Sequence, residues 1–128
     1  MRNEKFEYEM PKLIFSEEKL EIKVTAGEKV RGYEVDRRLK ERFEQLGCAQ
    51  YLMHRTGHNI GHRCHGIGAN LDDYETHDDR CLLPGTMFSI EPGLYTDKYG
   101  VRLEYDVHIT SEGETKVYGP VQDEILVI

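Results

Sequence analysis

The sequence predicts an α+β fold in which an antiparallel sheet packs with one main amphipathic helix. Apolar residues recur at helical spacing from Glu34 to Leu46. Later in the chain two strand-like segments, Met87 to Tyr95 and Val101 to Ile109, are separated by the turn-like sequence Thr96 to Gly100. One helix followed by an antiparallel hairpin is the basis for this fold class.

The composition indicates one domain of ordinary size, in a chain of 128 residues with a formal net charge of −7. An acidic surface without a Lys/Arg run argues against a nucleic-acid partner. No stretch is apolar enough to cross a bilayer, so no membrane association is expected. Three irregularly spaced cysteines argue against a disulfide framework and for a cytoplasmic location; these are Cys48, Cys64 and Cys81.

The first 26 residues differ in pattern from the remainder and predict short, half-buried strands, because apolar and polar side chains alternate there. The alternating apolar residues are Phe6, Tyr8 and Met10, then Leu20, Ile22 and Val24. Ala26-Gly27 ends the pattern. We therefore divide the chain into an N-terminal strand-like segment of unclear origin, residues 1–26, and a domain at residues 27–128.

The amphipathic helix is predicted from about Glu34 to Leu46. Its apolar positions recur every three or four residues, and charged side chains occupy the opposite face. Gly47 stands where a helix often ends in a left-handed residue. The predicted role is a helix that covers the core, without chemistry of its own. The apolar positions are Val35, Leu39, Phe43 and Leu46.

Four histidines lie within twelve residues, from His54 to His65. The glycines among and after them are too frequent for a stable helix, so this segment is predicted to be irregular strand and loop. The polar segment Asn70 to Asp79 that follows is predicted to be a surface loop. Clustered imidazoles with carboxylates on adjacent strands are the donors that a transition-metal site needs.

The predicted hairpin places carboxylates beside these histidines. Alternate side chains share a face of a strand, so Arg102, Glu104 and Asp106 point together. Directly opposed side chains lie about 5 Å apart. Glu91 and Glu104 could therefore clamp a cation if the register places them opposite each other. Glu91 is also flanked by apolar residues, and a buried carboxylate needs a cation or hydrogen-bond donors to stay ionised.

Other interpretations of the histidines remain open at this level. A helical His-Glu-x-x-His zinc motif is disfavoured because Arg55 replaces the glutamate and Gly57 interrupts the motif. A thiolate zinc site lacks Cys-x-x-Cys spacing, although Cys64 beside His65 could bind stray metal. The histidines could also be ordinary surface or core residues, and the glutamates ordinary strand residues.

Three ordered motifs resemble one known family, the pita-bread metallopeptidases, which include prolidase, Xaa-Pro aminopeptidase, methionine aminopeptidase and creatinase. The resemblance is closest to prolidase and Xaa-Pro aminopeptidase, and it concerns the C-terminal half of the catalytic domain. It implies a partial pita-bread fold and cleavage of the bond before proline. The motifs are His54-Arg-Thr-Gly-His58-Asn-Ile-Gly with His65 following, Pro84 to Tyr95, and Gly100 to Val107, within Val30 to Thr110.

The resemblance also implies roles for individual residues. His58, Glu91 and Glu104 would be metal ligands, and Arg102 would hold a ligand carboxylate in place. Glu91 would serve as a proton acceptor, while His54 and His65 would bind substrate and stabilise the tetrahedral intermediate. In place of the arginine that tends to bind the substrate carboxylate, this chain has His77, with Arg80 nearby. His62 matches no functional position.

The resemblance implies two divalent ions, Mn, Co or Zn, held by five ligands, of which the first two are aspartates in the N-terminal half. No such aspartate pair precedes the helix in this sequence. Four carboxylates would neutralise two divalent ions, whereas Glu91 and Glu104 neutralise one. At most one weakly bound ion is therefore expected.

Two functional hypotheses follow from this ligand count. The chain is either a truncated Xaa-Pro peptidase that is inactive alone, or a catalytically silent half that acts as a dimerisation or binding module. A half-domain would expose a sheet edge. We therefore expect a homodimer or a separate N-terminal half as partner, and a peptide as substrate once the site is complete.

Overall fold

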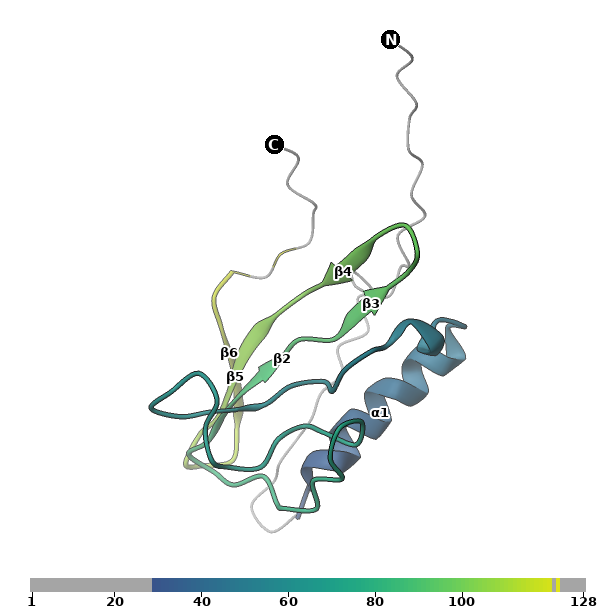
Figure 1. Ribbon diagram of the computed structural model, residues 1–128. Helices are drawn as coiled ribbons and strands as arrows, with labels where there is room; N and C mark the ends of the chain where they lie inside the picture. The colour runs from purple at the N-terminus through teal and green to yellow at the C-terminus, as the bar shows by residue number, and fades with distance from the viewer. Residues whose placement is uncertain (1–28, 121, 123–128) are drawn as a thin grey trace.

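The computed structural model describes residues 29–120 and 122 and has one α-helix and two antiparallel sheets (Figure 1). This arrangement confirms the predicted α+β class. The strands predicted within residues 1–26 lie outside the described residues. The elements are α1 (Gly32–Gln45), the 3-10 turn η1 (Ala49–Tyr51), β1 (Asn59–Ile60), β2 (Met87–Ile90), β3 (Gly93–Tyr95), β4 (Gly100–Arg102), β5 (Tyr105–Ile109) and β6 (Thr115–Tyr118).

Helix α1 begins two residues before the predicted start and ends one residue before the predicted end. At its N-terminus the backbone N–H of Arg31 donates to Glu34 Oε2 at 2.7 Å. At its C-terminus Gly47 adopts a positive φ of 71°, and the backbone N–H of Cys48 donates to the Phe43 carbonyl at 3.0 Å. This is the left-handed helix ending that the glycine predicts.

The long hairpin is interrupted in the middle of both strands. Strands β2 and β5 pair up to Ile90 opposite Tyr105, and β3 and β4 resume with Gly93 opposite Arg102. The prediction of two continuous strands was therefore wrong at this point. Pro92 explains the interruption, because it has no N–H to donate across the ladder. The register is the same on both sides of the break, so one hairpin runs through both sheets (Figure 1).

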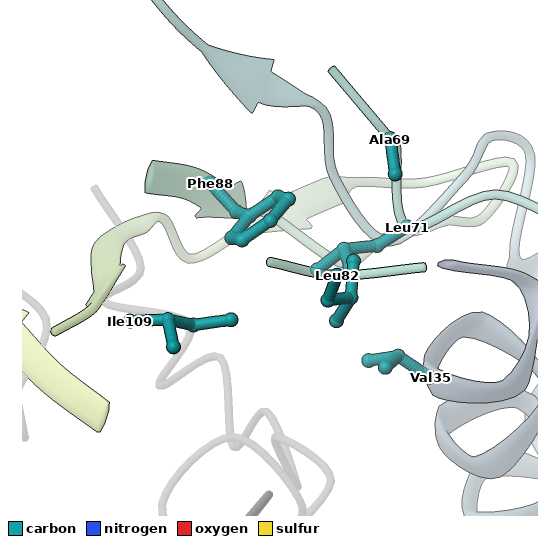
Figure 2. Close-up of a cluster of buried hydrophobic side chains, with 6 residues drawn as sticks. All are labelled: Val35, Ala69, Leu71, Leu82, Phe88 and Ile109. Atoms are coloured by element: carbon teal, nitrogen blue, oxygen red, sulfur yellow. The ribbon is translucent and has the colours of Figure 1, made fainter. Parts of the chain in front are cut away.

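The main core lies between the start of α1 and the four-stranded sheet, whose order is β1-β2-β5-β6. Figure 2 shows that side chains from the helix, the connecting loops and two strands converge there. A second cluster joins Phe43 of α1 to Leu94 of β3. The helix is thus attached to both sheets, which holds the two parts of the hairpin against it. The main cluster consists of Val35, Ala69, Leu71, Leu82, Phe88 and Ile109.

The segment from Asn70 to Asp79 is more buried than predicted. Its side chains Leu71, Asp72 and Asp78 are buried, whereas Tyr74 is exposed. Leu71 joins the main core, and the two aspartates have partners within the fold. The prediction of a surface loop was therefore wrong for part of this segment. A helix long and apolar enough to span a membrane does not occur in the described part of the chain.

Candidate metal centre

The histidine-bearing segment is held between α1 and the hairpin. Asp36, which is buried on α1, accepts hydrogen bonds from the backbone N–H and hydroxyl of Thr56, at 2.8 and 2.6 Å. On the other side the Thr56 carbonyl accepts the backbone N–H of Glu91 at 2.7 Å. Gly57 lies so close to β2 that an added Cβ would fall 1.9 Å from the Ser89 carbonyl oxygen. Contacts to both neighbours therefore fix the backbone of this segment.

His58 and Glu91 form the centre of the site. The Nε2 atom of His58 lies 3.2 Å from Glu91 Oε1, and the His58 side chain is 7% exposed. The buried hydroxyl of Ser89 connects the two residues: it accepts the backbone N–H of His58 at 3.0 Å and donates to Glu91 Oε1 at 3.0 Å. The imidazole and the carboxylate are therefore held side by side.

The hydrogen bonding of His58 determines which ring nitrogen can bind a cation. Its Nδ1 atom lies 3.0 Å from the backbone carbonyl of Asn59, which can only accept a hydrogen bond. Nδ1 therefore carries a hydrogen, which leaves Nε2, beside Glu91, as the ring nitrogen that can bind a cation. Two ligands on one transition-metal ion are about 2.9–3.4 Å apart, given bonds of about 2.1 Å. The 3.2 Å separation fits this range.

Glu104 faces Glu91 across the break in the hairpin, because the common register of the two sheets brings these positions opposite each other. Arg102 links their carboxylates, at 3.8 Å from Glu91 Oε2 and 3.7 Å from Glu104 Oε2. The side chains of Arg102 and Glu104 are 51% and 45% exposed. Glu104, the third predicted ligand, thus lies on the open side of the site, and the positively charged Arg102 side chain lies between the two carboxylates.

His54 contacts the hairpin through the side chain of Tyr95. Its Nδ1 atom is 2.8 Å from the Arg55 carbonyl, and its Nε2 atom is 2.8 Å from the Tyr95 hydroxyl. Nδ1 is consequently the protonated nitrogen, and Tyr95 donates to Nε2. The two rings also meet edge to face, with centroids 5.4 Å apart. Tyr95 therefore orients the His54 ring, and its hydroxyl occupies the Nε2 atom of His54 in this structure.

His65 returns to the site from an exposed loop. Its ring lies against His58, with centroids 4.2 Å apart. Cys64 is exposed beside it, and donor atoms of His58, Cys64 and His65 all lie within 4.8 Å of one another. His62 is also exposed in this loop. The structure thus brings His65 next to a predicted ligand.

His77 and Arg80 have their partners away from the hairpin. The Nδ1 atom of His77 lies 2.6 Å from Asp73 Oδ1, and its ring stacks on Tyr33 at 4.2 Å. This hydrogen bond and a second one from Arg37 lower the pKa of the Asp73 carboxyl. Arg80 donates to both carboxylate oxygens of Asp78, and these bonds lower the pKa of that carboxyl to about 2. The predicted substrate-binding pair therefore engages nearby aspartates in this structure.

Three residues that position the site were not predicted from the sequence: Asp36, Ser89 and Tyr95. A buried Asp within the otherwise apolar face of α1 is a signal that could have been used, because such a group needs partners. Ser89 precedes Glu91 by two residues within the predicted strand Met87 to Tyr95, so alternation predicts that the two side chains share a face. Nothing in the pattern identifies Tyr95 as the partner of His54, because 41 residues separate them.

Comparison with protein families gives a match to metallopeptidase family M24 over residues 19–111. The probable dipeptidase PepE of Mycobacterium tuberculosis is 36% identical over 90 residues, which are 69% of this chain and 23% of that protein. The Xaa-Pro dipeptidase of Pyrococcus furiosus is 32% identical over 85 residues, or 66% of this chain and 23% of that protein. The chain thus spans about a quarter of the length of the curated relatives it matches.

Solved structures show the same likeness in three dimensions. The dipeptidase PepE of Mycobacterium ulcerans matches with a TM-score of 0.66 and 30% identity, over 77% of this chain and 25% of that one. The Xaa-Pro dipeptidase of Bacillus anthracis matches with a TM-score of 0.67 and 32% identity, over 78% of this chain and 27% of that one. The arrangement of helix, histidine segment and hairpin is therefore shared with these peptidases.

Proposed function

This chain belongs to metallopeptidase family M24, and we propose that it supplies one wall of a divalent-cation site, meaning the residues that bind the cation from one side. The complete site would hydrolyse the peptide bond before proline. Membership confirms the family and the partial pita-bread fold that the three motifs predict. The observation that carries the proposal is the His58–Glu91 pair, 3.2 Å apart and fixed by Ser89. Relatives named as Xaa-Pro dipeptidases support the substrate class.

The described residues would act in distinct ways at this wall. His58 offers the lone pair of Nε2, and Glu91 offers carboxylate oxygens that can bind a cation or take up a proton. Arg102 orients the Glu91 and Glu104 carboxylates through its two nitrogens. A divalent cation bound here would polarise the scissile carbonyl and acidify water. His65, whose ring lies against His58, and His54, which is bonded to Tyr95 of the hairpin, are the candidates for contacting the peptide.

We further infer that the 128-residue chain does not turn over substrate by itself. The candidate ligands of the described wall are His58, Glu91 and Glu104, and the two carboxylates neutralise one divalent ion. Arg102 already contributes a positive charge between them, which weakens cation binding. One weakly held ion is the expected occupancy, with Mn²⁺, Co²⁺ and Zn²⁺ as candidates. Two further carboxylates would have to come from a second wall.

The second wall is proposed to come from another polypeptide segment that covers the exposed side of the site. Glu104 and Arg102 are both about half exposed there, so an approaching carboxylate pair could reach an ion held by His58 and Glu91. A second copy of this chain and a separate segment with two aspartates are the two candidate sources. A stable monomer that gains no activity on mixing with the N-terminal part of a homologous prolidase would count against both.

The test measures cation binding and turnover in parallel. Titration calorimetry with Mn²⁺ should show at most one weakly bound ion, and Glu91→Gln should reduce the affinity by at least about tenfold. Glu112→Gln, an exposed change in the turn between β5 and β6, serves as the matched control. The chain alone should not hydrolyse an alanyl-proline dipeptide with Mn²⁺ or Co²⁺, whereas the completed site should. Turnover by the chain alone that Glu91→Gln abolishes would overturn the inference of inactivity.

Failure of both assays would favour a different function. If the completed assembly forms but neither binds Mn²⁺ nor hydrolyses the dipeptide, the fold serves as a catalytically silent dimerisation or binding module. The contact of Arg102 with both glutamates is the observation that favours this second candidate, because the positive charge of Arg102 already balances part of their negative charge.

A further inference from the structure

The loop after β1 brings a thiol and two imidazoles together at one place. Donor atoms of His58, Cys64 and His65 all lie within 4.8 Å of one another. His58 is buried, while Cys64 and His65 are exposed on the loop. We propose that these three side chains form a binding site for one thiophilic divalent cation of the Zn²⁺ class. This site goes beyond the proposed peptidase wall, because it adds a sulfur ligand, and it does not depend on turnover.

Asn59 holds the ligand-bearing loop in place. Its carbonyl accepts the backbone N–H of Gly66 at 2.8 Å, and its side-chain oxygen accepts that of Gly68 at 3.1 Å. Its amide group donates in turn to the Met87 carbonyl at 3.2 Å, which attaches the loop to β2. The backbone that carries Cys64 is therefore positioned without a metal, which lowers the ordering cost of binding.

The two glycines allow this close packing. A Cβ at Gly66 would lie 2.1 Å from Asn59 Oδ1, and a Cβ at Gly68 would lie 2.7 Å from the same side chain. Side chains at either position would push the loop away from Asn59. Glycine at positions 66 and 68 thus allows the loop to fold back towards His58.

The separations are suited to a tetrahedral ion after a small adjustment. Nitrogen and sulfur ligands on one Zn²⁺ are about 3.3–3.6 Å apart, given bonds of about 2.0–2.3 Å. Donors within 4.8 Å therefore need to approach one another by at most about 1.2–1.5 Å. Rotation of the exposed Cys64 and His65 side chains can supply this movement, while the buried His58 stays fixed by Asn59 and Ser89.

The charges at the site also match a divalent ion. The Nε2 atom of His58 lies 3.2 Å from Glu91 Oε1. An ion bound by His58 at Nε2 would therefore lie close to this carboxylate, whose negative charge would favour binding. One thiolate and one carboxylate together neutralise a charge of +2. Thiolate and imidazole ligands favour Zn²⁺ over the oxygen-preferring Mn²⁺.

The experiment uses Co²⁺ as a spectroscopic substitute for Zn²⁺, with the full chain kept under a phosphine reductant. We expect one equivalent of Co²⁺ to produce a thiolate-to-metal charge-transfer band in the near ultraviolet, which Zn²⁺ then abolishes by displacement. Cys64→Ser should remove the band and weaken Zn²⁺ binding at least about tenfold in competition with a chromophoric chelator, because it removes a direct ligand. His65→Ala should weaken Zn²⁺ binding similarly.

Two control variants distinguish this site from binding at another thiol and from binding at the peptidase wall. Cys81→Ser removes a half-buried thiol outside the cluster and should leave the band unchanged. Glu104→Gln should weaken Mn²⁺ binding at the peptidase wall but should retain the band. Circular dichroism checks that each variant folds, which is expected because Cys64 and His65 are exposed. An absent band, a band that survives in Cys64→Ser, or Zn²⁺ affinity unchanged in that variant would overturn the proposal.

Discussion

Two carboxylates in the described part of the chain, Asp36 and Glu91, differ in how completely they are hydrogen-bonded. Asp36 is buried and accepts three hydrogen bonds, two from Thr56 and one from the backbone N–H of Asp73 at 2.7 Å. Glu91, by contrast, accepts one hydrogen bond from Ser89 and has longer contacts with His58 and Arg102. The first arrangement saturates the carboxylate, whereas the second leaves oxygen lone pairs available to a cation.

This difference separates carboxylates that stabilise the fold from carboxylates that can serve a site. A saturated buried carboxylate replaces the water it has lost, so removing it leaves unpaired donors inside the protein. An incompletely bonded carboxylate at the surface contributes little to stability, because its ion pairs are screened by solvent. Stability measurements on matched Asp→Asn and Glu→Gln variants can therefore test the assignment.

The largest effect is expected for Asp36→Asn. The change replaces one acceptor oxygen with an NH₂ group that faces donors, and it should lower the free energy of unfolding by about 2–3 kcal/mol. Urea denaturation measures this difference. Glu41→Gln, an exposed change on the same helix, is the control and should stay within about 0.5 kcal/mol of the wild type. Equal effects of the two changes would show that Asp36 does not secure the histidine segment.

An intermediate effect is expected for Asp78 at low pH. Arg80 lowers the pKa of this carboxyl from 3.8 to about 2 in the folded state. The ionised form is therefore favoured by folding, and its contribution of about 2 kcal/mol is fully present above pH 3.8 and is lost as the pH falls towards 2. Arg80→Gln should flatten this part of the stability–pH curve, measured by urea denaturation. Asp79→Asn, at an exposed neighbour, should leave the curve unchanged.

The smallest effect on stability is expected for Glu104→Gln. Its side chain is 45% exposed, and its contact with Arg102 spans 3.7 Å. The change should alter the free energy of unfolding by less than about 0.5 kcal/mol, because an exposed ion pair contributes little. Mn²⁺ affinity measured on the same variant should nevertheless fall. A stability loss comparable to that of Asp36→Asn would place Glu104 with the structural carboxylates and remove it from the site.

Much of the site could be predicted from motifs in the sequence, but its supporting contacts could not. Strand alternation indicated that Glu91 and Glu104 could clamp a cation if the hairpin register placed them opposite each other. The structure supplies that register. The interruption at Pro92 was visible in the sequence and was not used in predicting two continuous strands. The polar segment from Asn70 to Asp79 was predicted to lie at the surface, yet Asp72 and Asp78 are buried because Arg55 and Arg80 contact them.

The sequence by itself determined the helix, the hairpin and the family, because periodicity, turn residues and ordered motifs are local properties. Only the tertiary structure decided how the parts meet. It placed Asp36 of α1 on Thr56 and the Tyr95 hydroxyl on His54, across 20 and 41 residues. It also brought Cys64 and His65 back to His58. Such contacts depend on the packing of helix, loop and sheet together, and no local pattern specifies them.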